Sequence, residues 1–91
     1  MKTVRARITG RVQGVFYRAW TQQEATRRGL AGWVRNRRDG SVEAVFSGDE
    51  EMVDGMVRAC RQGPPMAGVD GIDLEEDRRP EETGFHQRPT A

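Results

Sequence analysis

Residues 3–18 read TVRARITGRVQGVFYR, a strand pattern that leads into a loop containing two glycines. Apolar and polar side chains alternate over residues 3–9, which is typical of a strand that buries one face. Gly10 and Gly14 bracket the loop, and we expect a helix over residues 18–29, ended by its terminal glycine. This stretch decides the fold because it sets a half-buried strand directly before a helix.

A β-hairpin is predicted next. Residues 30–37 form an extended segment, and Asp39-Gly40 in the turn 38–41 is typical of a hairpin. Residues 42–47 alternate again, as in a second half-buried strand. The positions expected on its core face are Val42, Ala44 and Phe46.

The two predicted helices differ in the strength of their apolar stripes. The first helix has few apolar positions, namely Tyr17, Trp20 and Ala25. Asp49 can cap the second helix, which must end before Gly63-Pro64-Pro65. Apolar side chains recur at helical spacing along it, and we expect these to lie in the core: Met52, Val53, Met56, Val57 and Cys60.

Two further strands complete the chain. Val69, Ile72 and Leu74 indicate a fourth strand, in which a break of the alternation near Gly71 predicts a bulge. Residues 85–88 are expected to add a short fifth strand that the next proline ends.

The order strand, helix, strand, strand, helix, strand is that of an α+β ferredoxin-like βαββαβ sandwich, in which two helices cover one face of an antiparallel sheet. A chain of 91 residues is too short for two independently stable cores. We therefore expect residues 1–91 to form a single domain. This fold hosts many functions, so function must come from a site.

Composition argues against several classes of partner. The chain has 15 basic and 14 acidic residues, so its net charge of +1 would attract neither nucleic acid nor a membrane strongly. No apolar run approaches the ~20 residues that span a bilayer, and no leader is evident, so we expect a cytoplasmic protein. Cys60 is the only cysteine and cannot form an internal disulfide. His86 is the only histidine, which argues against a His-rich metal site and favours a surface position.

The loop over residues 10–18 is the candidate site. It joins a strand to a helix start, where unpaired backbone N–H groups and the positive helix end can bind an anion. Arg18 would add a planar charged fork suited to two phosphate oxygens. The loop lacks the Gly-Lys-Ser/Thr ending of a nucleotide-binding P-loop and the Gly-x-Gly-x-x-Gly dinucleotide pattern. From spacing alone, an ordinary turn with a surface arginine is the better interpretation.

Two longer segments change that interpretation. Residues 10–18 (GRVQGVFYR) and residues 29–36 (GLAGWVRN), the latter followed by DGSVE at 39–43, resemble the two signatures of the acylphosphatase family. Residues 63–69 (GPPMAGV) also resemble the family's segment before its fourth strand. The resemblance therefore spans nearly the whole chain.

The resemblance implies an enzyme that hydrolyses acyl phosphates to a carboxylate and inorganic phosphate without a metal or an organic cofactor. It implies that Arg18 binds the phosphoryl group and that Asn36 positions the attacking water. The phosphate cradle would comprise Gln13, Gly14, Val15, Phe16, Tyr17 and Arg18. We expect a monomer whose only partner is a small-molecule acyl phosphate, with no nucleic acid and no membrane.

The segment from Gln13 to Arg18 invites comparison with the Cys-x5-Arg loop of cysteine-dependent phosphatases, although it is one residue shorter. It contains no cysteine, so no side-chain nucleophile is available there, and we expect direct attack by water and no phosphoenzyme.

Two other interpretations remain open. The same element order underlies the RRM fold, but residues 41–47 offer no pair of base-stacking aromatics. The second interpretation is a protein that keeps this fold and binds phosphate but has lost enzymatic turnover. The presence of both Arg18 and Asn36 argues against it. One departure from the family pattern is Gln87, which stands where an apolar residue is usual and casts doubt on the last strand more than on catalysis.

Overall fold

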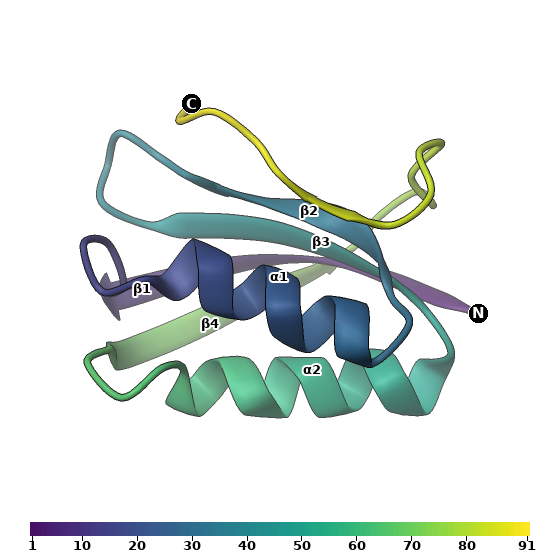
Figure 1. Cartoon of the computed structure of the whole chain (residues 1–91), viewed down its shortest axis with the longest axis horizontal. Coiled ribbons are helices and arrows are strands. Elements are labelled where there is room, and N and C mark those ends of the chain that lie inside the picture. Colours follow the sequence, from purple (N-terminus) through teal and green to yellow (C-terminus); the bar gives the residue numbers. More distant parts are fainter.

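Two helices pack against one face of a five-stranded sheet in the computed structural model, which describes all residues 1–91 (Figure 1). This is the predicted ferredoxin-like α+β architecture. In chain order the elements are β1 (Lys2–Arg11), α1 (Tyr17–Arg27), β2 (Ala31–Asn36), β3 (Val42–Gly48), α2 (Glu50–Gln62), β4 (Gly68–Glu76) and β5 (Phe85–Gln87).

The sheet has the strand order β4-β1-β3-β2-β5 and is mixed rather than wholly antiparallel. β1 pairs antiparallel with β3 and β4, and β2 pairs antiparallel with β3, as predicted. The predicted fifth strand is present but runs parallel to β2. The chain crosses from β4 at one edge to the other edge after residue 76, so β5 enters beside β2 in the same direction.

The predicted bulge is confirmed in β4. Thr9 pairs with Gly71, whereas Gly10 pairs with Val69, so Asp70 has no partner on β1. The extra residue explains why the alternation along this strand breaks near Gly71.

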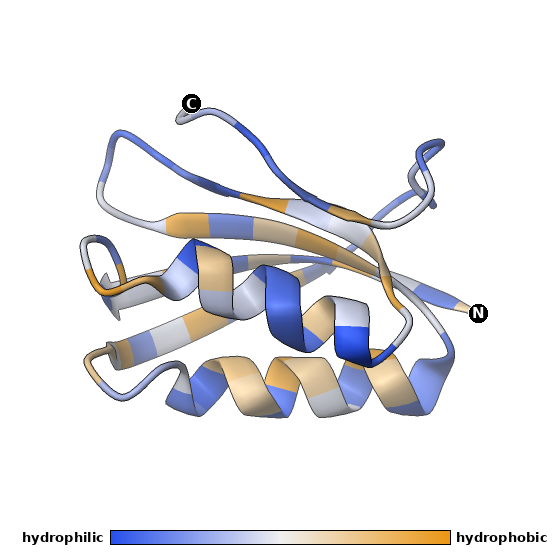
Figure 2. Ribbon diagram, viewed as in Figure 1, coloured by the Kyte–Doolittle hydropathy of each residue, from blue (hydrophilic) through white to orange (hydrophobic).

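The face of the sheet toward the helices forms the core. Figure 2 shows apolar positions of the strands interleaved with polar ones, as the alternation predicts. Cys60 is fully buried there, as expected. The prediction for Met52 was wrong, because its residue surface is 41% exposed at the start of α2. The buried side chains of α2 are Val53, Met56, Val57 and Cys60.

The first helix buries a polar residue in place of a predicted apolar one. Trp20 is only partly buried, whereas Thr21 is completely buried with Tyr17 and Ala25. The hydroxyl of Thr21 donates to the carbonyl of Tyr17 at 2.8 Å, which satisfies the hydroxyl inside the helix. The sequence pattern did not show this pairing.

The other face of the sheet carries no helix and is held by charge. Glu43 is 5% exposed and forms ion pairs with Arg35 at 2.7 Å and Arg37 at 3.1 Å. Burial alone would raise the pKa of Glu43, but hydrogen bonds from both arginines outweigh it and leave the pKa below its usual range. Trp33 lies on the same face and packs against Arg35 and Arg88, whose guanidinium carbons are 4.8 and 4.9 Å from the ring centroid.

The predicted hairpin turn is confirmed and rests on Asp39. Its carboxylate accepts hydrogen bonds from the backbone N–H and hydroxyl of Ser41, at 2.9 and 2.6 Å. It also accepts one from Arg7 at 2.6 Å. The Ser41 hydroxyl is the main cause that lowers the pKa of Asp39 from 3.8 to about 2.

We predict that Asp39→Asn lowers the stability of the folded protein at neutral pH. In this variant, stability should also depend less on pH below 4. A carboxyl whose pKa is depressed in the folded state stabilises the fold above its unfolded pKa, and this contribution is lost as the pH falls from about 4 to about 2. Urea midpoints at pH 7, 4 and 2 measure the effect, with the exposed Asp70→Asn as control. Equal pH dependence in wild type and Asp39→Asn would contradict the assignment.

Candidate active site

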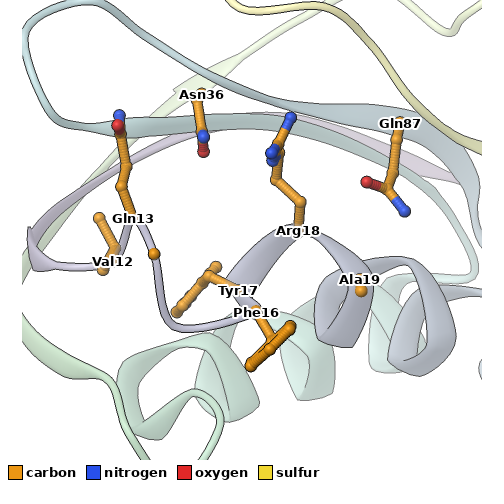
Figure 3. A pocket seen from close by; sticks show the side chains of 9 residues that line it. Val12, Gln13, Phe16, Tyr17, Arg18, Ala19, Asn36 and Gln87 are labelled. Atoms are coloured by element: carbon orange, nitrogen blue, oxygen red, sulfur yellow. The ribbon is translucent and has the colours of Figure 1, made fainter.

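A cleft of about 280 Å³ opens between the β1–α1 loop and the ends of β2 and β5 (Figure 3). The residues that line it are Val12, Gln13, Gly14, Phe16, Tyr17, Arg18, Ala19, Asn36 and Gln87.

The register of the sheet brings the two parts of this cleft together. Ile8 of β1 and Asn36 of β2 both pair with Val42 of β3, one from each side. Neighbouring strands are about 4.8 Å apart, so Ile8 lies about 10 Å from Asn36 at the end of β2, and the loop follows a few residues after Ile8, at the end of β1. Residues far apart in the chain therefore face one cleft.

The loop presents a run of unpaired backbone donors. No N–H group from Gly14 to Ala19 donates a hydrogen bond to another backbone or side-chain group of the chain. Gly14 and Phe16 have φ of 74° and 63°, so left-handed residues stand on both sides of Val15 and curl the backbone. The first turn of α1 also contains no acidic residue. Unpaired donors, a curved backbone and a positive helix end are the features that allow a loop of this kind to bind an anion.

Phe16 is the one residue other than glycine with a positive φ. Its surface is 82% exposed, so no packing in the core supports this conformation. A left-handed backbone costs a residue with a side chain roughly 1–2 kcal/mol. Such outliers concentrate at functional sites.

Arg18 and Asn36 enter the cleft from different elements. Figure 3 shows Arg18 reaching up from the first turn of α1 and the Asn36 amide reaching down from the end of β2. None of the ion pairs in the chain includes Arg18. The Oδ1 atom of Asn36 is buried and has no hydrogen-bond partner. Such an atom costs about 1–3 kcal/mol, which a bound water or ligand would relieve.

The side chain of Gln13 ties the loop to the hairpin. Its Nε2 donates to the carbonyls of Arg37 at 2.8 Å and Ser41 at 2.9 Å. Arg37 follows Asn36 directly, so these bonds hold the loop at a set distance from the Asn36 amide. The side chain of Gln13 therefore supports the loop. Val15, also predicted for the cradle, has its side chain in the core.

Tyr17 anchors the start of α1 on α2. Its buried hydroxyl donates to the carbonyl of Cys60 at 2.6 Å. Burial raises the pKa of Tyr17, so the hydroxyl remains a neutral donor. A Cβ atom at Gly63 would lie 2.7 Å from the Tyr17 ring, which explains the glycine there. The anchor fixes the backbone from which the Arg18 side chain extends.

Gln87 is a cleft residue that the sequence did not indicate. Its Nε2 donates to Gln22 of α1 at 2.8 Å, and Gln22 donates in turn to the carbonyl of Phe85 at 3.1 Å. Figure 3 shows the Gln87 amide beside Arg18. The polar side chain of Gln87 thus joins α1 to β5 and lines the cleft.

The residues after β5 continue along β2 and reach Asn36. The N–H of Arg88 donates to the carbonyl of Val34 at 2.9 Å, and that of Ala91 donates to the carbonyl of Asn36 at 3.0 Å. The last strand, on which Gln87 cast doubt, is present but short, and the segment after it stays hydrogen-bonded to β2. This segment holds the backbone of Asn36 from the outer side.

No group of three or more His, Cys, Asp or Glu side chains is arranged to hold a metal ion. The side chain of His86 is 45% exposed, and its ring nitrogen bonds the carbonyl of Thr83, so the expected surface position is confirmed. Neither α1 nor α2 has the length and apolar character needed to cross a membrane.

We predict that Gln13→Leu weakens the binding of inorganic phosphate about tenfold and lowers the free energy of unfolding by about 1–3 kcal/mol. The change removes the two hydrogen bonds that tie the loop to the hairpin, while the carbonyls of Arg37 and Ser41 each keep one backbone donor. Calorimetric titration with phosphate and urea unfolding measure the two effects. Gln23→Leu, on the exposed side of α1, is the matched control. Wild-type phosphate affinity in Gln13→Leu would contradict the supporting role.

Comparisons with known proteins identify the family to which the chain belongs. A family model described as Acylphosphatase matches residues 4–87. The chain is 53% identical over 90 residues to an acylphosphatase of Rhodospirillum rubrum, with 99% of each chain covered. It is 50% identical over 86 residues to one of Rhizorhabdus wittichii, covering 94% of this chain and 87% of that one.

Solved structures show the same fold. The acylphosphatase of Bacillus subtilis superposes with a TM-score of 0.90 at 40% identity, covering 97% of this chain and 99% of that one. An acylphosphatase of Coxiella burnetii superposes with a TM-score of 0.91 at 31% identity, covering 96% and 92%. Each superposition thus covers nearly the whole chain. The chain therefore belongs to the acylphosphatase family of enzymes.

Proposed function

We propose that this enzyme hydrolyses acyl phosphates by direct attack of a water that Asn36 orients, while the Gln13–Arg18 loop and the Arg18 side chain bind the phosphoryl group. The observation that carries the proposal is the buried, unpartnered Oδ1 of Asn36 in the cleft that also holds unpaired N–H groups and Arg18. An acceptor and a set of donors thus face one another across a space open to a small anion.

The donors suit a phosphoryl group. Phosphoryl transfer spreads charge over three equatorial oxygens, so catalysis depends mainly on position and electrostatic stabilisation. Backbone N–H groups of residues 14–18 would donate hydrogen bonds to some of these oxygens. The planar guanidinium of Arg18 would donate two more. The Gln13 bonds keep these donors in place before the substrate arrives, so little reorganisation is needed.

The acceptor suits a nucleophilic water. Asn36 Oδ1 would accept a hydrogen bond from the water and direct a lone pair of its oxygen at phosphorus, although an amide is too weak a base to deprotonate water. The water oxygen forms the new bond to phosphorus while the bond to the acyl oxygen breaks, and the electron pair leaves with the carboxylate. Both hydrogens of the water end on the product, H₂PO₄⁻. A carboxylate leaves readily, so no strong general acid is required.

No side chain of the loop is placed to form a phosphoenzyme. The loop contains no cysteine, and the side chain of Gln13 is engaged in hydrogen bonds to the hairpin. Cys60 lies in the core, where burial raises the pKa of its thiol to about 12. We infer a single displacement by water.

The cleft needs no further group for this chemistry. We infer that the enzyme works without a metal or an organic cofactor, as a monomer. A cytoplasmic setting is consistent with the single free cysteine. We also infer that nucleic acid is not a partner, because Trp33 on the helix-free face is covered by two arginines rather than free to stack on a base.

We predict that hydrolysis of benzoyl phosphate is unchanged by EDTA and falls about 10² to 10³-fold or more in Arg18→Ala. Arg18 would stabilise the transferring phosphoryl charge, and loss of one such donor costs about this factor. Release of benzoate is followed by absorbance in EDTA, with Arg27→Ala on the exposed end of α1 as control. Activity that disappears in EDTA and returns with a metal ion would contradict the mechanism.

We further predict that Arg18 is needed for phosphate binding, whereas Asn36 is needed for turnover only. Arg18→Ala should abolish the binding of inorganic phosphate together with activity. Asn36→Ala should keep phosphate affinity within about threefold while kcat falls by about 10² or more, because Asn36 would act on the water. Calorimetry with phosphate and steady-state kinetics test the division. Loss of phosphate binding in both variants would refute it, and phosphate binding by a wild type without turnover would favour a non-catalytic relic.

A further inference from the structure

The direction of attack determines where the acyl group must lie. In-line displacement places the leaving oxygen on the side of phosphorus opposite the attacking water. Asn36, at the end of β2, holds the water in the proposed function, on which this inference rests. The acyl group therefore leaves toward the wall of the cleft that faces away from β2.

That wall is formed by the start of α1. Figure 3 shows Phe16 on the side of the cleft away from Asn36, whereas the guanidinium of Arg18 reaches the level of the Asn36 amide. Ala19 lines the same side and is exposed, so its small side chain leaves room at the opening. Gln87 comes from β5, beside β2, and so lies with Asn36 and not with the acyl group. The lip of the cleft on the leaving side is thus apolar.

The exposed phenyl ring at this lip has no role in the folded protein alone. It is 82% exposed, and the side chain packs in no part of the core. A left-handed backbone at this position would be less strained with glycine or asparagine, and either would serve the anion-binding curl equally well. A phenylalanine therefore stabilises neither the loop nor the core. Its surface is available to a ligand that enters the cleft.

We propose that Phe16 is a specificity residue that contacts the acyl group, so that this enzyme favours acyl phosphates with an apolar or aromatic acyl group over those with a small one. The phosphoryl group would be held by the loop in either case, and the ring would add contact only with the larger acyl group. Discrimination would therefore come from binding of the part of the substrate that does not react.

The test is the ratio of kcat/KM for benzoyl phosphate to that for acetyl phosphate. Phe16→Asn tolerates the left-handed backbone and removes the ring, and Phe16→Leu keeps an apolar side chain. We expect the ratio to fall about tenfold in Phe16→Asn, mainly through the KM for benzoyl phosphate, and to stay within about threefold in Phe16→Leu. Met52→Asn, which alters an exposed apolar residue on α2 outside the cleft, should leave the ratio unchanged.

The outcomes separate this inference from the proposed function. An unchanged ratio in Phe16→Asn, whether both substrates are unaffected or both lose activity equally, overturns the role of the ring while the hydrolase stands. A wild type that hydrolyses neither substrate overturns the proposed function itself, and this inference with it. A ratio that falls in Met52→Asn as much as in Phe16→Asn also overturns the assignment.

Discussion

Two hydrogen bonds from the Gln13 amide to the carbonyls of Arg37 and Ser41 join the loop after β1 to the hairpin after β2. The cleft depends on this junction, since the unpaired N–H groups lie on one side of it and Asn36 lies on the other. A phosphoryl group is small, and the atoms that bind it must be held to within a fraction of an ångström. The sheet sets the approximate separation through the shared partner Val42, and the Gln13 bonds fix the loop on that frame.

The cleft concentrates features that reduce stability. The free N–H groups of residues 14–19, the unpartnered Asn36 Oδ1 and the left-handed Phe16 each lack an interaction that a stable fold would supply. The surrounding structure compensates for them. Tyr17 is fixed on α2 by its bond to Cys60, and the segment after β5 holds the backbone of Asn36 from outside. Rigid support around unsatisfied groups is the arrangement expected of a site prepared for its ligand.

The two faces of the sheet are covered by different kinds of side chain. The helix-covered face excludes water through apolar packing, and it carries Asn36 and Gln87 only at the rim, where the cleft opens. The helix-free face instead buries Glu43 beneath arginines, which satisfies the carboxylate while long side chains cover the sheet. An apolar surface there would invite association with other chains, so a charged network suits an unpaired face.

Local patterns allowed much of this molecule to be predicted from its sequence. Alternation gave β1 and β3, Asp39-Gly40 gave the hairpin, and the spacing from Val53 to Cys60 gave the buried stripe of α2. These features depend on periods of two and 3.6 residues, which are properties of neighbouring residues. The family signatures identified the acylphosphatase family in the same way, because they are contiguous.

The features that the sequence left undecided, or that were predicted wrongly from it, depend on contacts between distant segments. The exposure of Met52 depends on where the edge of the core falls, and the burial of Thr21 depends on how α1 sits on the sheet. The parallel direction of β5 and the place of Gln87 in the cleft follow from the crossing of the chain to the far edge of the sheet. The sequence by itself determined the elements and the residues with the right chemistry. Only the tertiary structure decided which of these residues share a cleft, because that depends on strand register and on hydrogen bonds such as those of Gln13, which join segments 24 and 28 residues apart.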